Sequence, residues 1–212
     1  MKFRFFLVAA AMTVIGAVSL GAQTASEIVG RMSEEMSKSD AQGSAMTFAV
    51  KIPMVGEVSS YVMSLGDKTK MEMSGKDKDV VVWLDADTKW EYDLSAGEVV
   101  ITAKEASSSD SSRQSDISRF ENISEGYKLV LNKEDDEAWY ITCRKKSSNK
   151  NKDDFKKMKV VVAKDTYLPL ELSGGNCLFK ISITDFALGV SDAEVTFRAA
   201  DYPGVKITDN RM

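Results

Sequence analysis

Few side chains in this sequence are suited to catalysis. The chain of 212 residues contains no histidine, the side chain that most often serves as a general base or as a zinc ligand. Two carboxylate pairs, Asp85/Asp87 and Asp135/Asp136, fall in predicted turns, where aspartate is favoured because it bonds its own backbone. A calcium loop needs more oxygen ligands at regular spacing than either pair offers. We therefore expect no metal, no cofactor and no enzymatic activity.

The sequence does not decide whether its two cysteines, Cys143 and Cys177, form a disulfide. Export to an oxidising compartment would favour a bridge between them. The antiparallel meander predicted below places two strands between them, at about 4.8 Å per strand, which is beyond bonding reach. Without a histidine, the two thiols make a poor zinc site.

The first 22 residues have the pattern of a secretory signal peptide. Lys2 and Arg4 precede the apolar run 5–20, and small residues follow it. We expect cleavage near Ala22, which leaves a single exported domain at 23–212; a membrane anchor is the alternative, although the run is short for a bilayer span. Cleavage removes two basic and no acidic residues, so the net charge falls from −4 to about −6, which argues against a nucleic-acid binder.

One amphipathic helix and many short strands are predicted. The helix covers Ser26–Lys38 with Ser26 as its N-cap, and its apolar stripe consists of Ile28, Val29, Met32 and Met36. From Ala45 the apolar residues recur with period two, interrupted by turn residues. This pattern predicts a mainly β (α+β) fold: an unclosed antiparallel barrel or strongly curved sheet of about 10–11 strands, with helices over its concave apolar face.

The stretch Asp79–Thr102 is the most strongly patterned part of this sheet. Trp90 and Tyr92 lie two residues apart and therefore share one strand face, and Trp83 lies on the preceding strand. These rings need a large apolar partner to cover them.

Methionines offer a second apolar feature. Residues 23–212 contain nine of them: Met32, Met36, Met46, Met54, Met63, Met71, Met73, Met158 and Met212. The flexible thioether chain suits a lining that repacks around varied ligands, and it is also a common core filler. The composition alone does not separate these two roles.

Two further segments have two interpretations each. Ala106–Gly126 carries Ile117, Phe120 and Ile123 at every third position, so it is either a helical lid or a packed connection. Arg144–Lys159 carries eight basic residues. It is either a solvated hairpin that protects a sheet edge, or a docking patch for an acidic partner or an anionic membrane.

Two stretches resemble the LolA family of periplasmic outer-membrane lipoprotein carriers. They are DTKWEYDLSAGEVVIT at 87–102 and VTFRAADYPGVKITDNR at 195–211, the latter with Phe197, Pro203 and Arg211 in the family's order. The resemblance implies an unclosed barrel with an apolar cavity that holds the acyl chains of a lipoprotein. It implies a periplasmic, monomeric carrier whose partners are an inner-membrane lipoprotein-releasing ABC transporter complex and an outer-membrane receptor.

On this basis we expect a ligand cavity lined by apolar side chains beneath the helix stripe. Its expected lining is Met32, Met36, Phe48, Met71, Met73, Trp83, Trp90, Tyr92, Ile117 and Phe120. The segment GDKTKMEM at 66–73 departs from the family, because Asp67 or Lys68 falls near the position of a family arginine associated with lid closure. The family's mechanism of lid closure is therefore not expected to apply to this chain.

Two other functions fit the same fold. A lipid or glycolipid shuttle would use the same cavity for a different cargo. A lipoprotein-sensing regulator would contact a membrane signalling protein and usually carries a further domain, so a chain ending at residue 212 favours the carrier.

Overall fold

The computed structural model describes residues 23–75, 79–104, 123–152 and 154–211. Its helices are α1 Ala25–Met36, α2 Ser39–Gln42, α4 Ile123–Gly126, α5 Asp192–Val195 and the 3₁₀ helix η1 Ala199–Asp201. Its strands are β1 Ser44–Ile52, β2 Gly56–Leu65, β3 Lys68–Ser74, β4 Asp79–Leu84, β5 Thr88–Asp93, β6 Glu98–Ala103, β7 Tyr127–Glu134, β8 Ala138–Lys145, β9 Lys157–Ala163, β10 Pro169–Gly175, β11 Lys180–Leu188 and β12 Lys206–Asp209.

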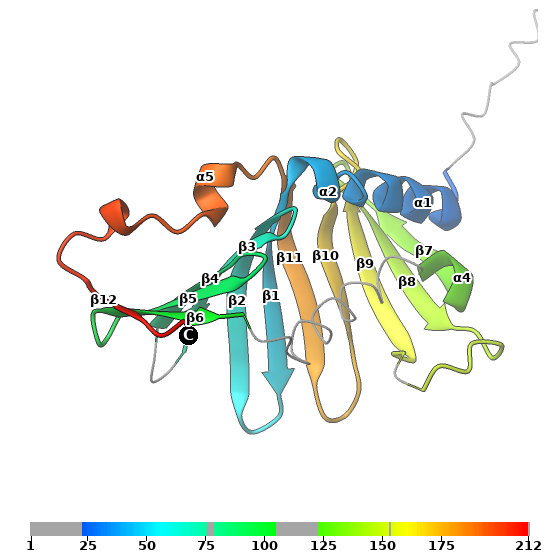
Figure 1. Cartoon of the computed structure of the whole chain (residues 1–212). Helices are drawn as coiled ribbons and strands as arrows, with labels where there is room; N and C mark the ends of the chain where they lie inside the picture. The colour runs from blue at the N-terminus through cyan, green and yellow to red at the C-terminus, as the bar shows by residue number, and fades with distance from the viewer. Residues whose placement is uncertain (1–22, 76–78, 105–122, 153, 212) are drawn as a thin grey trace, which may run out of the picture.

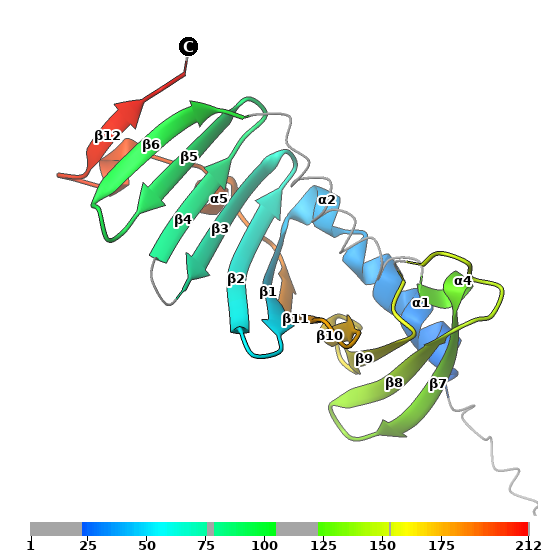
Figure 2. The same cartoon turned by 90° about the horizontal axis from the view of Figure 1, so that it is seen from below.

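All twelve strands form one curved sheet (Figures 1 and 2). Their order is β12-β6-β5-β4-β3-β2-β1-β11-β10-β9-β8-β7. In this part of the chain β12 and β7 are the two edges and do not pair with each other, so the sheet stays open. The predicted fold class is confirmed. One pairing was not predicted: β12 runs parallel to β6, whereas the sequence suggested antiparallel pairs throughout.

Helix α1 forms where the apolar stripe predicts it. Ile28, Val29, Met32 and Met36 are all buried. The N-cap is Thr24 rather than the predicted Ser26. Thr24 and Glu27 make a capping box, in which the Thr24 hydroxyl accepts from the Glu27 N–H at 3.2 Å and the Glu27 carboxylate accepts from the Thr24 N–H at 2.8 Å.

The strand register assigns every side chain to one of two faces, because directly paired residues point the same way. Met46 pairs with Val62, Val62 with Met71, and Met71 with Val82. Met46 packs in the core beneath α1. We call this the inner face, and the opposite one the outer face.

The main core lies between α1, α4 and the inner face of β1 and β7–β11. It contains residues from both helices, from these six neighbouring strands and from the loop before β9: Ile28, Val29, Met32, Met36, Met46, Ile123, Tyr127, Trp139, Ile141, Cys143, Phe155, Met158, Val160, Val162, Leu172, Ile181 and Ile183. A 12-residue helix is marginal alone, so this contact with the sheet stabilises α1.

The C-terminal segment crosses the outer face at the other wing of the sheet. Val195 of α5 is buried with Ala45 and Met63, which pair with each other on that face. The alternation of polar and apolar residues at 194–197 would suit a strand. Instead, a capping box starts a short helix there: the Glu194 carboxylate accepts hydrogen bonds from the Ser191 hydroxyl at 2.6 Å and from the Ser191 backbone N–H at 2.8 Å.

Both cysteines are free; Cys143 is buried on β8 and Cys177 is exposed after β10. Strands β9 and β10 lie between them, as the meander predicted. Within the described ranges, no helix has the length and apolarity needed to cross a bilayer.

Candidate functional site

A strip of apolar side chains continues the inner face beyond the core. It runs over β1–β4 and consists of Phe48, Val50, Val62, Met71, Met73, Val80 and Val82. Met71 is buried at 3% exposure, whereas Phe48, Val50, Val62 and Met73 are only partly buried. We call these seven residues the inner strip. Its partly exposed members give it the surface that an apolar ligand would contact.

The inner strip has one apolar border and one polar border. Phe48, Val50 and Val62 pack against the core that holds α1. On the other side, Glu91 pairs with Val82 across β4 and β5, and its carboxylate meets Lys89 at 2.7 Å. The apolar surface therefore ends at β5.

Methionines gather on this side of the sheet. Of the nine in residues 23–212, six lie on the inner face or in the helix stripe that packs on it: Met32, Met36, Met46, Met71, Met73 and Met158. Met63 lies on the outer face and Met54 in an exposed turn. An unbranched thioether chain adapts its shape easily, so the inner face can repack around a bound chain.

The structure divides the predicted cavity residues between the two faces. Met32 and Met36 are in the core beneath α1, and Phe48, Met71 and Met73 are in the inner strip. Ile117 and Phe120 lie outside the described residues.

Trp83, Trp90 and Tyr92 lie on the outer face and not beneath the helix stripe. Trp83 pairs with Lys70 and Trp90, and Lys70 pairs with Met63 of the outer-face cluster. The expectation that the rings line one surface with Met71 and Met73 is therefore corrected. The period-two pattern showed correctly that Trp90 and Tyr92 share a face, but not which face.

The C-terminal segment covers these rings. Phe197 lies 5.3 Å from Trp83 and 5.9 Å from Trp90 between ring centroids, and Tyr202 lies 5.6 Å from Trp83 and 5.3 Å from Tyr92. Trp83 is only 2% exposed. We call these five residues the aromatic cluster. It joins the two stretches that carry the family resemblance, which lie about a hundred positions apart in the sequence.

Lys68, near the position of the family arginine, ties the C-terminal segment to β3. Its ammonium donates to Asp192 at 2.6 Å and to Thr196 at 3.1 Å. The hydrogen bond to Asp192 raises the pKa of Lys68, and the same bond lowers the pKa of Asp192. This contact lies on the outer face, away from α1.

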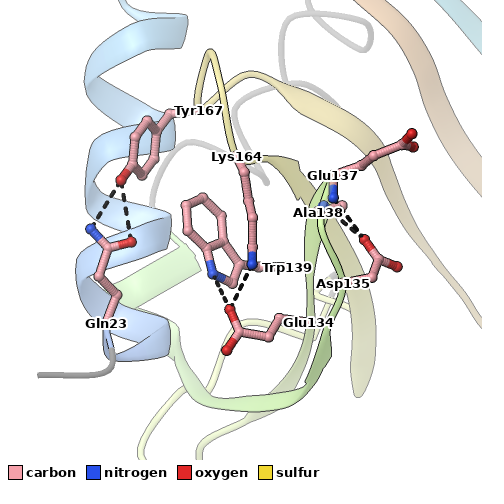
Figure 3. A network of polar contacts seen from close by, with 8 residues as sticks. All are labelled: Gln23, Glu134, Asp135, Glu137, Ala138, Trp139, Lys164 and Tyr167. Carbon is pink, nitrogen blue, oxygen red and sulfur yellow. Dashed lines mark hydrogen bonds and ion pairs between the residues drawn. The ribbon is translucent and has the colours of Figure 1, made fainter. Parts of the chain in front are cut away.

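A polar network fixes the start of α1 to the β9–β10 hairpin (Figure 3). The Gln23 amide and the Arg31 guanidinium each donate to the Tyr167 hydroxyl, at 2.9 and 3.0 Å. The Tyr167 ring packs 5.1 Å from Trp139, whose indole N–H donates to Glu134 at 3.1 Å. The helix is thus held by polar contacts from Gln23, just before its first turn, and from Arg31, halfway along it, and by apolar packing along its length.

Glu134 is the acidic centre of this network. Its carboxylate also meets Lys164 at 2.9 Å, and this hydrogen bond holds the pKa of Glu134 below its usual value. At neutral pH the carboxylate therefore stays charged and keeps Trp139 and Lys164 in place.

Little in the described residues is suited to bond-making chemistry. No group of three His, Cys, Asp or Glu side chains in these ranges is placed to hold a metal ion. Burial raises the pKa of the Cys143 thiol to about 12, so its reactive thiolate form is scarce at neutral pH.

Comparison with known proteins gives matches among solved structures. No protein-family model matches the sequence, and no curated protein matches it significantly. An uncharacterised conserved protein from Thermus thermophilus is 16% identical, with 89% of this chain and 100% of the other covered and a TM-score of 0.42. A LolA superfamily protein from Nitrosomonas europaea is 13% identical, with coverage of 84% and 100% and a TM-score of 0.35.

Structures of the LolA superfamily are thus among those that this chain resembles. A chain of the Pseudomonas aeruginosa MucA/MucB complex is also similar, at 17% identity, with 82% of this chain and 61% of the other covered and a TM-score of 0.42. At these identities and TM-scores the similarity concerns the fold only and carries no argument about function. The described sheet itself has twelve strands, two edges that do not pair with each other, and a helix on its apolar inner face.

Proposed function

We propose that this protein is a periplasmic carrier that binds the acyl chains of lipoproteins and escorts them from the inner to the outer membrane. The observation that supports this most is the inner strip with its methionine-rich surroundings. It offers a continuous apolar surface in an open sheet, next to a helix that is anchored separately at its start.

The physical need for such a surface is clear. Each buried methylene of an acyl chain contributes about 0.8 kcal/mol, so an acylated protein leaves a membrane only if its chains remain covered. A cover of this kind requires an adaptable apolar lining. Its proposed lining is Met32, Met36, Phe48, Met71 and Met73. Transfer from a lipoprotein-releasing ABC transporter complex and to an outer-membrane receptor belongs to the same proposal.

The strand register provides a test of this proposal, because acyl chains should contact side chains on the inner face of the sheet and not those on the outer face. A photo-crosslinking amino acid is placed at Phe48 or Met73 in the inner strip, and at Val130 on the outer face as a matched control. Val130 pairs with Thr142 on the side away from the core and is 38% exposed. After irradiation with a synthetic triacylated lipopeptide, adducts are counted by mass spectrometry.

Carrier function predicts adducts at Phe48 and Met73 and few at Val130. Equal labelling at all three positions would reject the inner strip as the binding surface. Native mass spectrometry of protein from the periplasm of its own host then identifies the cargo. A co-purifying triacylated lipoprotein supports the carrier; free lipid alone would indicate a shuttle, and an empty protein bound to a membrane signalling protein would indicate a sensor.

A further inference from the structure

Five basic residues form a row across the outer face at one end of the sheet. Lys51 on β1 pairs directly with Lys180 on β11, which pairs on its other side with Gly175 of β10. Lys157 on β9 pairs with Arg144 on β8, and Arg144 pairs with Lys128 on β7. Gly174 pairs with Met158, so Gly175 and Lys157 are at the same level. We call Lys51, Lys180, Lys157, Arg144 and Lys128 the basic row.

The basic row is exposed and largely unneutralised. All five side chains are exposed, and within the described residues none of them forms a salt bridge. Two carboxylates lie near one end of the row. Glu57 pairs with Lys51 across β1 and β2, and Glu171 is close enough to Lys180 for their charges to interact, although its salt bridge is to Lys159 at 2.5 Å.

Such an arrangement costs stability. Like charges directly opposite on neighbouring strands repel each other, and this row contains three such pairs. The whole chain has an excess of acidic residues, with a net charge of −4. Concentrating positive charge on five strands at one end is therefore not explained by overall composition, and it creates a local attraction for anions.

Exposed apolar side chains lie next to the basic row. The turn between β1 and β2 begins two residues after Lys51 and presents Met54 and Val55 at 106% and 76% exposure. The turn between β10 and β11 presents Leu178 at 69% exposure, just before Lys180. Because β1 pairs with β11, these turns are neighbours, and Figures 1 and 2 show them side by side at the end of the sheet away from α1.

Met54 is unusual in its backbone as well as in its exposure. Its φ is +64°, a region that glycine and asparagine occupy more easily than methionine. A glycine would satisfy the turn at less strain. A large apolar side chain kept fully in water at a strained position contributes nothing to the core, which points to a contact outside the protein.

We propose that the basic row and the two adjacent turns form a docking surface for an anionic phospholipid membrane. Lys51, Lys180, Lys157, Arg144 and Lys128 attract the lipid phosphates. Met54, Val55 and Leu178 enter the interface between head groups and acyl chains. This inference does not rest on the proposed cargo, because it concerns the opposite face of the sheet.

The apolar turns favour a membrane over an acidic protein. An acidic protein would pair its carboxylates with the basic row alone. Met54, Val55 and Leu178 would then have no partner. Amphipathic surfaces that combine lysines with protruding apolar groups bind at the lipid interface, with an attraction that depends on anionic lipid and is screened by salt.

The test uses the mature chain and sedimentation with lipid vesicles. Vesicles of phosphatidylcholine and phosphatidylglycerol in equal parts should bind the protein at low salt, and vesicles of phosphatidylcholine alone should bind it much less. Removing one charge should lower the partition coefficient about fivefold. The double variant K51S/K180S therefore loses about 25-fold. The variant K38S/K133S loses the same charge elsewhere on the surface and should bind like the wild type.

Met54→Gly tests the apolar contribution separately. It should lower binding about tenfold, as expected for losing one partly inserted apolar side chain, while leaving the thermal midpoint nearly unchanged since the strained turn accepts glycine. Equal binding of K51S/K180S and K38S/K133S would overturn the docking surface. Binding to polyglutamate without binding to anionic vesicles would also overturn it and would identify an acidic protein as the partner.

Discussion

Replacement of Phe197 by leucine tests whether the aromatic cluster stabilises the fold or contacts ligand. The side chain is partly buried and its ring packs on Trp83, Trp90 and Tyr202 at centroid distances of 5.3, 5.9 and 5.6 Å. Leucine keeps most of the apolar contact but removes three ring–ring interactions. Each such pair contributes about 0.5–1.5 kcal/mol, and the lower end applies to a partly exposed ring, so we expect a loss of about 1.5–2 kcal/mol.

Urea unfolding followed by tryptophan fluorescence measures this loss directly. In a domain of this size, about 1.5–2 kcal/mol lowers the melting temperature by roughly 3–8 °C. Phe179→Leu is the matched control, because Phe179 is also partly buried but has a single ring contact among the described residues, with Phe155 at 6.0 Å. Its loss should be about 0.5–1 kcal/mol.

The affinity for an acyl ligand shows whether the aromatic cluster stabilises the fold or contacts the ligand. Measured at a temperature where both proteins are folded, the affinity of F197L for a fluorescent fatty acyl probe should equal that of the wild type, because the cluster lies on the outer face. A variant that loses affinity for the probe but keeps its full stability would refute the assignment of Trp83, Trp90 and Tyr92 to a structural role.

Three further predictions concern single contacts. Thr24→Ala removes the capping box of α1 and should lower the free energy of unfolding by about 1 kcal/mol, with faster amide exchange confined to the first turn. Iodoacetamide at pH 8 should modify the exposed Cys177 in the folded protein and the buried Cys143 only after unfolding. Burial raises the pKa of Cys143 from 9.0 to about 12, so folding favours the neutral thiol. The free energy of unfolding should therefore fall as the pH rises from about 9 toward 12, where the unfolded chain loses this proton and the folded chain keeps it. Lys68→Met removes the ammonium that lowers the pKa of Asp192, so carboxyl carbon shifts in NMR should show that pKa rising toward its usual value.

Periodicity predicted the local structure well. The spacing of Ile28, Val29, Met32 and Met36 identified both the helix and its buried stripe, because a single helix fixes which residues share a face. The N-cap was misplaced by two positions, since Thr24 and Ser26 are both good caps and only the contact of Thr24 with Glu27 separates them.

The C-terminal segment was harder to predict because its structure depends on distant partners. Phe197 and Tyr202 cover the tryptophans of β4 and β5, and β12 adds to β6 in parallel. Nothing in the local sequence specifies either contact. Residues 195–197 have the composition of a strand, whereas the structure forms a capping box at Ser191 and a short helix that ends at Val195.

The face occupied by a strand's side chains is a property of the whole sheet. Alternation shows that Trp90 and Tyr92 point the same way, but their direction relative to α1 follows only from the unbroken pairing of Met46 with Val62, Val62 with Met71 and Met71 with Val82. A one-residue slip at any of these pairs would exchange the two faces. Met46 sets the reference for the series, because it shares a core with Met32 of α1.

That register also explains how the two faces of one sheet can differ in chemical character. With period two, the same strand that gives Val50 to the inner strip gives Lys51 to the basic row. A substitution at Val50 therefore changes the inner strip and a substitution at Lys51 changes the basic row, so the proposed ligand surface and the proposed docking surface can be tested separately. An open sheet with exposed residues on both faces leaves both faces accessible from solvent, whereas closing the sheet into a barrel would enclose the inner face and leave only the outer face on the surface.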